Sequence, residues 1–391
     1  MREVVVVGAT RTPIGDFGGS LRDVSAISLG VRAIESVVEK AGIDKTLVEM
    51  TVMGNNFDTI NHNFARIVAV KAGIPIEAPA FQINATCVSG MQAIICGVQA
   101  IQHNDVDVMV AGGVESMSNA PYLLTKARWG QRFQHGIMVD PIWGAMQEYP
   151  LGVGMGLTAE NLAEKYDISR QEQDEFALLS QMRASSAVRE GRFKDEITPV
   201  VIPQGKKDPK IVEIDEHPRA DMTLEKLAQL PPAFKQGGTI TAGNSCGIND
   251  AAAAVILMAE DKARELSLKP LARIVGYAQV GVDPSYMGIG PVPATRKVLK
   301  RTGLSLDRIG LIEINEAFAA QYLACERELG WNRDIVNVNG SGISLGHPVG
   351  CTGTRLVVTL IHEMAKRNIS LGLATLCAGG GQGYAMVVER L

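Results

Sequence analysis

Residues 81–101 read FQINATCVSGMQAIICGVQAI, and this stretch decides the fold class. A β-type run from Phe81 to Ile83 leads to Cys87, and Ser89 and Gly90 then permit a sharp turn before a segment that is apolar on every face. A helix that is hydrophobic all round is buried between other elements. The stretch therefore predicts a strand, a tight turn and a buried helix, which is the unit of layered α/β proteins.

The same alternation of short β-branched runs and longer helical segments continues through the 391 residues, so we expect an α/β protein with largely buried sheets. Similar elements recur near both ends of the chain, which predicts two similar α/β halves and an inserted cap between them. The expected domains are 1–118 with 241–270, the inserted loop domain 119–240, and 271–391. Strands are expected at 3–7, 106–111 (ending in the glycines at 112 and 113), 308–314 and 371–377, with a second set of elements opening at 271–280. Helices are expected at 28–41, 169–190, 251–259 and 293–302, and a solvated charged hairpin at 206–219.

Composition excludes several classes of function. A net charge of −4 and a pI near 5.9 leave no basic stripe for a nucleic-acid backbone. The first apolar run is too short for a signal sequence or a membrane span, so no membrane partner is expected. The six cysteines are scattered through a large chain without a CxxC pair, which favours reduced thiols in the cytoplasm and no structural metal.

Cys87 is the first candidate for chemistry. Its place at the N-terminal end of a buried helix gives it unpaired N–H groups and the positive end of the helix dipole, and both favour a thiolate nucleophile. A small buried hydrophobe is an equally good interpretation of this local context. The other glycine-rich clusters of the chain shift the balance toward chemistry.

His347 lies in NGSGISLGHPVGCTGTRLVV (residues 339–358), framed by glycines and a proline that hold the backbone close to a ligand. Cys377 ends a strand and is followed by a glycine run that includes Gly379, which offers a second thiol beside backbone N–H donors. Asn315 stands between a strand and an apolar helix, where a simple N-cap is the better interpretation of the residue on its own. Ligand sites of α/β sheets gather outside the carboxyl ends of strands, so these clusters are expected to meet.

The motifs C-x-S-G at residues 87–90, N-E-A-F-A at 315–319, G-H-P-x-G at 346–350 and C-x-G-G-G-x-G at 377–383 resemble the thiolase family. The resemblance is nearest to acetyl-CoA acetyltransferases and 3-ketoacyl-CoA thiolases, and it runs almost end to end. It implies a thiolase-like fold and a reversible Claisen condensation of acyl-CoA with acetyl-CoA, or thiolysis of a 3-ketoacyl-CoA, most simply acetoacetyl-CoA. Coenzyme A is then substrate and product, no cofactor or metal is needed, and a homo-oligomer is expected, a dimer or a tetramer. A place in fatty acid metabolism follows from the same resemblance.

Roles of individual residues are implied only through this resemblance. Cys87 would accept the acyl group, His347 would activate it, and Cys377 would move the proton at the α-carbon of the second acyl-CoA. One oxyanion hole would consist of His347 and a water on Asn315, and the other of the N–H groups of Cys87 and Gly379. Coenzyme A would contact residues of the cap and of both halves, namely Met155, Arg219, Phe234, Cys246, Met287, Ala317 and Phe318.

Three departures from the family pattern concern the acyl chain and coenzyme A rather than the reaction. Gly154 stands where short-chain members often carry His, Cys246 stands where Ser is usual, and the cap differs, with a lengthening expected between residues 140 and 151. Two alternatives remain open: a ketoacyl synthase-like condensing enzyme, and a catalytically silent CoA-binding subunit of the same fold. The second thiol, Cys377, favours a thiolase over the synthase.

Overall fold

The computed structural model describes residues 2–147, 151 and 153–391. Within these residues ten strands form one sheet. Nine of them follow the order β10-β11-β12-β9-β1-β8-β5-β3-β4, and β2 pairs with β8; β6 and β7 form a separate hairpin. The strands of the main sheet are β1 (Val4–Arg11), β2 (Gly15–Asp16), β3 (Met50–Gly54), β4 (Ala80–Ile83), β5 (Val108–Ser116), β8 (Asn249–Ala259), β9 (Ala272–Gly281), β10 (Leu311–Ile314), β11 (Leu371–Ala378) and β12 (Gln382–Arg390).

The sheet consists of two parts with the same pairing pattern. In one part β3 is parallel to β5, β5 antiparallel to β8, and β8 antiparallel to β1. In the other, β10 is parallel to β11, β11 antiparallel to β12, and β12 antiparallel to β9. Only Val5 and Val6 of β1 pair with β9, so the two parts join at a narrow seam. This pattern agrees with the expected similarity of the two ends of the chain, while the exact domain boundaries stay a prediction.

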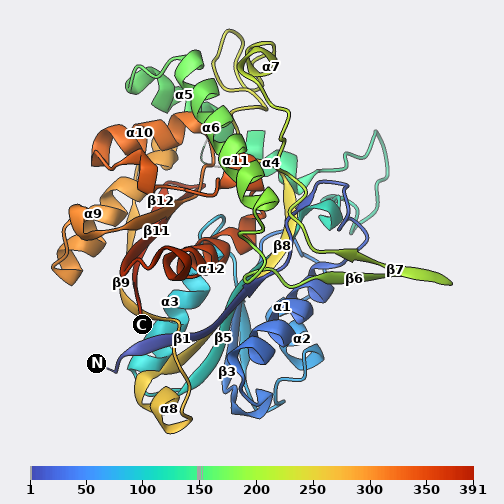
Figure 1. Cartoon of the computed structure of the whole chain (residues 1–391). Coiled ribbons are helices and arrows are strands. Elements are labelled where there is room, and N and C mark those ends of the chain that lie inside the picture. Colours follow the sequence, from blue (N-terminus) through green and yellow to red (C-terminus); the bar gives the residue numbers. More distant parts are fainter. Residues whose placement is uncertain (1, 148–150, 152) are drawn as a thin grey trace.

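Helices cover the sheet in layers (Figure 1). Between the two parts lie α3 (Ser89–Gln102) and α12 (Val349–Arg367), which pack against each other and against strands of both. Outside one part lie α1 (Ala26–Ala41) and α2 (Phe64–Lys71), and outside the other lie α9 (Pro291–Thr302) and α10 (Ala319–Leu329). Three buried apolar clusters fill the interfaces between these layers. The remaining helices are α4 (Pro141–Gln147), α5 (Met155–Lys165), α6 (Arg170–Arg189), α7 (Leu224–Ala228), α8 (Glu260–Glu265) and α11 (Gly342–Leu345).

The helix expected at 251–259 is wrong, because these residues form most of β8. β8 lies between β1 and β5 and every residue of it is buried, so both of its faces need apolar side chains. A short continuous apolar run fits a buried strand and a buried helix equally well by periodicity, and here position in the sheet overrides the helix propensity of alanine.

The strand expected to end at Gly112 and Gly113 also continues, since β5 runs on to Ser116. The glycines belong inside the strand because a Cβ atom at Gly113 would lie 2.0 Å from the carbonyl oxygen of Gly350 in α12. The strand therefore passes beneath the N-terminus of α12 without side chains between them.

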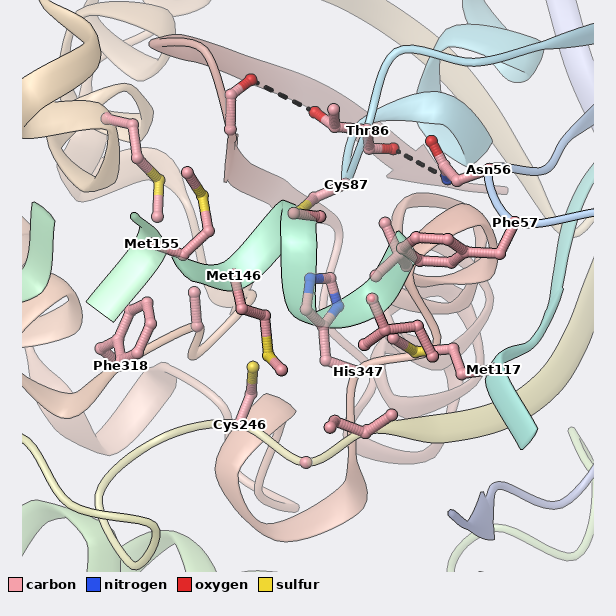
Figure 2. Close-up of a pocket in the computed structure, with 18 of the residues that line it drawn as sticks. Asn56, Phe57, Thr86, Cys87, Met117, Met146, Met155, Cys246, Phe318 and His347 are labelled. Carbon is pink, nitrogen blue, oxygen red and sulfur yellow. Dashed lines mark hydrogen bonds between the residues drawn. The ribbon is translucent and has the colours of Figure 1, made fainter. Parts of the chain in front are cut away.

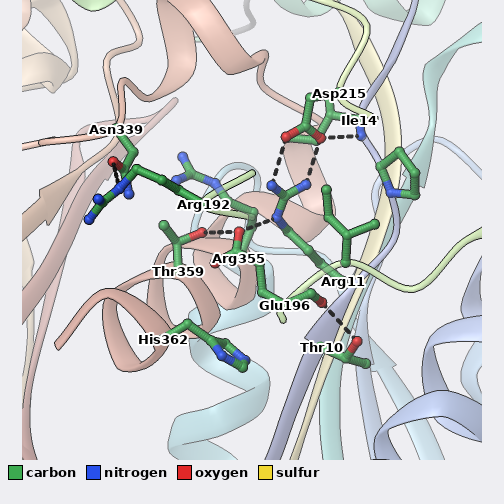
Figure 3. Close-up of polar contacts among 12 residues, drawn as sticks. Thr10, Arg11, Ile14, Arg192, Glu196, Asp215, Asn339, Arg355, Thr359 and His362 are labelled. Atoms are coloured by element: carbon green, nitrogen blue, oxygen red, sulfur yellow. Dashed lines mark hydrogen bonds and ion pairs between the residues drawn. The ribbon is translucent and has the colours of Figure 1, made fainter. Parts of the chain in front are cut away.

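The charged segment 206–219 is solvated only in its first part. The hairpin of β6 (Val200–Gln204) and β7 (Lys207–Val212) projects from the body, with most of its residues exposed (Figure 1). Asp215, in contrast, is buried and accepts two hydrogen bonds from Arg11 on β1, at 2.6 and 2.7 Å. Glu196 accepts a third from Arg11, at 2.6 Å, and one from Thr359 on α12, at 3.1 Å (Figure 3). This network fastens the segments around residues 196 and 215 to the core.

No helix in the described residues is long and apolar enough to cross a membrane.

Candidate active site

Cys87 occupies the turn between β4 and α3, as the sequence predicts. Thr86 has a left-handed backbone with φ of 52°, and the hydroxyl of Ser89 holds the turn by donating to the carbonyl of Thr86 at 2.6 Å and accepting from the amide of Ala85 at 2.8 Å. α3 begins at Ser89, so the thiol lies at the helix N-terminus. The strained turn thus directs the sulfur out of the strand and toward the helix end.

The electrostatics of Cys87 differ from the expectation of a thiolate. Burial raises the pKa of the Cys87 thiol to about 11, against the opposing effect of the backbone N–H groups of Gly379 and of Cys87 itself. Desolvation therefore outweighs the helix terminus, and the thiol is neutral near pH 7. A base must take its proton before it can attack.

His347 supplies a base in the right protonation state. Its Nδ1 lies 2.7 Å from the hydroxyl of Thr352, and that hydroxyl donates to the carbonyl of Pro348 at 2.9 Å. Because the hydroxyl proton is used in this way, Nδ1 carries the imidazole hydrogen and Nε2 is an acceptor. Burial, helped by the charge of Arg355, lowers the pKa of His347 to about 3, so the ring is neutral at physiological pH.

Contacts with Asn249 hold the loop that carries His347. Gly346 has φ of 101°, which only glycine adopts easily, and the backbone N–H of His347 donates to Asn249 at 2.9 Å. A Cβ atom at Gly346 would also lie 2.4 Å from the Asn249 side chain. The glycine frame seen in the sequence is thus explained by a required backbone conformation and a close contact.

Cys377 and Asn315 lie against the same site. Cys377 is buried near the end of β11. Burial raises the pKa of the Cys377 thiol well above its usual value, and the charge of Cys87 adds to this rise. Asn315 follows β10, with its Nδ2 3.5 Å from Nε2 of His347. It is not an N-cap, because the cap of α10 is Phe318, so that interpretation is wrong. Its buried Oδ1 has no hydrogen-bond partner in the described part of the chain.

A cavity of about 260 Å³ lies at this place, and neither Cys377 nor Asn315 is among its lining residues. Cys87, His347 and Gly379 line it, and Figure 2 shows the imidazole of His347 directed toward Cys87. Its other walls are mostly apolar and come from Phe57, Met117, Ile142, Ala145, Met146, Met155, Cys246, Ile248, Met287, Ala317, Phe318 and Val349. The site therefore holds a buried neutral thiol and a neutral imidazole on the wall of a mostly apolar pocket.

Most residues expected to contact coenzyme A lie on this cavity, namely Met155, Cys246, Met287, Ala317 and Phe318. Phe234 does not line it but packs edge-on against Phe318, with ring centroids 6.0 Å apart. Arg219 is exposed and does not line it either.

Sequence reasoning missed the contributions of Asn56 and Phe57 and of helix α4, which carries Ile142, Ala145 and Met146 into the cavity. Asn56 lies two residues after the end of β3, so the signal of a polar residue after a strand could have found it; Phe57 carries no such signal. α4 packs on Gly154, where a Cβ atom would lie 2.7 and 2.8 Å from two of its carbonyl oxygens. The expected lengthening of the cap between residues 140 and 151 lies partly outside the described residues.

Within the described ranges no group of three or more His, Cys, Asp or Glu side chains is placed to hold a metal ion.

Comparisons with known proteins agree with this geometry. Residues 4–261 match the family model "Thiolase, N-terminal domain" and residues 268–390 match "Thiolase, C-terminal domain". An acetyl-CoA acetyltransferase of Syntrophomonas wolfei is 50% identical over 396 residues, covering 100% of both chains. The crystal structure of the Bacillus anthracis acetyl-CoA acetyltransferase has a TM-score of 0.98 and 49% identity, covering 100% of this chain and 99% of that one.

The crystal structure of human mitochondrial 3-ketoacyl-CoA thiolase in complex with CoA has a TM-score of 0.96 and 43% identity, over 100% of this chain and 98% of the human one. These solved structures confirm the predicted α/β architecture of two similar halves.

Proposed function

The chain belongs to the thiolase family, and we propose that it catalyses the reversible condensation of two acyl-CoA thioesters through an acyl group carried on Cys87. The observation that carries this proposal is the meeting of Cys87, His347 and Gly379 on one cavity, with Asn315 3.5 Å from Nε2 of His347 and Cys377 near enough to Cys87 for their charges to interact. The activity is that of an acetyl-CoA C-acetyltransferase.

In the first step Nε2 of His347 takes the proton of Cys87 while the sulfur attacks the thioester carbonyl. The carbonyl becomes an oxyanion, the bond to the coenzyme A sulfur breaks, and the proton passes from His347 to the departing thiolate. An acetyl-cysteine and free coenzyme A result. The backbone N–H groups of Cys87 and Gly379 are directed toward this sulfur, so they are placed to donate to an oxyanion formed beside it.

In the second step His347, neutral again, takes the proton of Cys377 while that sulfur removes a proton from the α-carbon of a second acetyl-CoA. The resulting carbanion attacks the acetyl group on Cys87, a carbon–carbon bond forms, and the sulfur of Cys87 leaves and takes back the proton from His347. His347 and a water on Asn315 would stabilise the enolate oxygen; the unpartnered Oδ1 of Asn315 supports a water at this place. Thiolysis is the same sequence in reverse.

Coenzyme A is substrate and product of this reaction, and the proposed steps use side chains, backbone N–H groups and one water. The relatives named acetyl-CoA acetyltransferase support acetyl-CoA and acetoacetyl-CoA as substrates. The CoA complex of the human 3-ketoacyl-CoA thiolase supports binding of coenzyme A by this chain. Gly154 leaves room for α4 to approach the cavity, and we propose that this arrangement sets the preferred acyl length.

One experiment tests the proposal against both alternatives. Mass spectrometry after mixing the protein with acetyl-CoA should show one added acetyl group on Cys87, and acetoacetyl-CoA with coenzyme A should yield acetyl-CoA. Cys87→Ala should lose both signals while keeping the wild-type circular dichroism spectrum. A wild-type protein that gains no acetyl mass would be a silent subunit, and this outcome would refute the enzymatic function.

We further propose a homo-oligomer, a dimer or a tetramer. The loop from 120 to 140 exposes large aromatic side chains, with Trp129 89% and Phe133 85% accessible, and such apolar surface is typical of an interface. The edge strand β4 has exposed backbone groups that a second copy could pair with. Light scattering coupled to gel filtration measures the mass directly, and a monomer at micromolar concentration would contradict this.

A cytoplasmic location and a part in fatty acid metabolism are proposals as well. The six free cysteines support a reducing compartment. Cell fractionation tests the location, and accumulation of 3-ketoacyl-CoA in a strain lacking the protein tests the metabolic role.

A further inference from the structure

Glu115 is a fully buried carboxylate beneath the cavity, and the mechanism above does not use it. It lies near the end of β5, beyond the two glycines that the strand passes through. Its Oε1 accepts from the Asn55 side chain at 3.0 Å, the amide of Phe57 at 3.0 Å and the amide of Asn56 at 3.3 Å. Its Oε2 accepts from the amide and side chain of Asn56, each at 3.1 Å, and from the amide of Gly350 at 2.9 Å.

Every one of these partners is an N–H donor. An ionised carboxylate, which only accepts, satisfies all of them, whereas a carboxamide would place its own N–H groups against some of the donors. Burial raises the pKa of Glu115 to about 7, and the same hydrogen bonds oppose that rise.

One set of the hydrogen-bond partners of Glu115 connects it to the turn that carries Cys87. Asn56 and Phe57 line the cavity, and the side chain of Asn56 also donates to the carbonyl of Thr86 at 3.4 Å, in the peptide that precedes Cys87. Glu115 therefore fixes the loop after β3 against the strained turn that presents the thiol.

The remaining partner, the amide of Gly350, connects Glu115 to the helix end beside His347. Gly350 lies in the first turn of α12, together with Thr352, whose hydroxyl accepts from Nδ1 of His347. A Cβ atom at Gly350 would lie 2.9 Å from Oε2 of Glu115, so glycine is needed for this contact. The same carboxylate thus holds the helix end that orients the imidazole.

This charge has a cost for the reaction. The negative charge of Glu115 raises the pKa of the Cys87 thiol, and it also raises that of Cys351 on α12. A buried charge is also expensive to desolvate, and a residue kept for packing alone would be apolar. The hydrogen bonds must therefore serve a purpose that outweighs both effects.

We propose that Glu115 is a positioning residue of the thiolase reaction, which holds the turn of Cys87 and the helix end of His347 at a fixed separation. The inference rests on the proposed function and adds to it the part of the chain that sets the geometry of proton transfer. Displacements of about 1 Å at reacting groups can lower rates about a hundredfold.

Glu115→Gln tests this in the full-length protein, with initial rates of acetoacetyl-CoA thiolysis expressed per folded molecule. We expect kcat to fall roughly 10- to 100-fold while the KM values for coenzyme A and acetoacetyl-CoA stay within about threefold, because Glu115 lies below the cavity wall. Acetylation of Cys87, followed by mass spectrometry, should slow by a similar factor. The matched control is Glu196→Gln, which removes a buried carboxylate of the network in Figure 3, outside the cavity; it should lower the melting temperature and leave kcat per folded molecule unchanged.

Asn55→Ala is the second variant, because it removes one donor to Glu115 from a buried side chain that does not line the cavity. It should lower kcat severalfold and have no further effect in the Glu115→Gln background. If Glu115→Gln does not fold, Asn55→Ala decides alone. A folded variant whose kcat stays within twofold of an active wild type would overturn the inference and leave the proposed function standing. A wild type that neither turns over nor gains acetyl mass would refute the proposed function and, with it, the inference.

Discussion

Replacing His347 by alanine should slow acetylation of Cys87 by about 10² to 10⁴, the range of a positioned general base. The structure gives the reason for a large effect. With a pKa of about 11, the Cys87 thiol is ionised at pH 7 in only about one molecule in 10⁴, which corresponds to about 5 kcal/mol. Without a base, attack on acetyl-CoA has to use this small fraction.

The pH dependence of the two proteins should differ. The imidazole of the wild type has a pKa of about 3, so it stays an available base at every pH above about 5 and the acetylation rate changes little between pH 7 and 9. In His347→Ala the thiolate fraction grows about tenfold with each pH unit below the thiol pKa, so the rate should grow in the same proportion.

The assay is a quenched time course of acetyl-CoA with enzyme, read by mass spectrometry at several pH values. The matched control is His362→Ala, which removes a half-buried imidazole that contacts the carbonyl of Ala9 and does not line the cavity. That control should acetylate at the wild-type rate once corrected for folded protein. The assignment of His347 as base is refuted if its variant is acetylated within tenfold of the wild type at pH 7, or if its rate does not depend on pH.

Cys377→Ala should still take up an acetyl group from acetyl-CoA but fail to form acetoacetyl-CoA, and a variant that condenses normally would exclude Cys377 as the α-carbon base. Arg11→Ala leaves two buried carboxylates without their partner and should lower the free energy of unfolding by about 3 to 5 kcal/mol in urea titrations, whereas Arg22→Ala, at an exposed ion pair, should cost less than about 1 kcal/mol. Gly154→Ala should displace α4 and raise the KM for acetoacetyl-CoA severalfold, as measured by initial rates; Gly144→Ala, on α4 with open space around it, is the control and should leave that KM unchanged.

The sequence predicts where Cys87 and His347 lie in the fold because their surroundings are unusual locally. His347 needs Gly346 at a positive φ, and Cys87 needs the turn residues that precede α3. Such requirements restrict the residue types at neighbouring positions, and this restriction is visible in the sequence alone. The same holds for Gly379, whose glycine run allows the chain to turn back from β11 into β12.

Other features depend on contacts between distant segments, and local patterns do not reveal them. Glu115 looks like an ordinary polar residue after a strand, and its importance appears only when the loop after β3 and the start of α12 meet at its carboxylate. β8 is similar, since only its place between β1 and β5 makes a run of alanines a strand. In the sequence, Asp215 belongs to a charged segment that is typical of a solvated surface. The structure shows it buried against Arg11, which comes from a distant part of the chain.

Burial acts on the two reacting groups in opposite directions, and this determines how the proton must move. The thiol of Cys87 has a pKa of about 11 and the imidazole of His347 one of about 3, so a resting thiolate–imidazolium pair is uphill by on the order of 10 kcal/mol before the two charges attract. At contact distance the attraction between the thiolate and the imidazolium stabilises the pair by only about 4 kcal/mol in a protein environment. In the proposed mechanism the proton should therefore leave Cys87 together with attack on the thioester, where the oxyanion hole would share the new charge. The ultraviolet difference spectrum between the wild type and Cys87→Ser should accordingly show no thiolate absorbance at pH 7, and a thiolate band at that pH would mean that the ion pair exists before substrate binds.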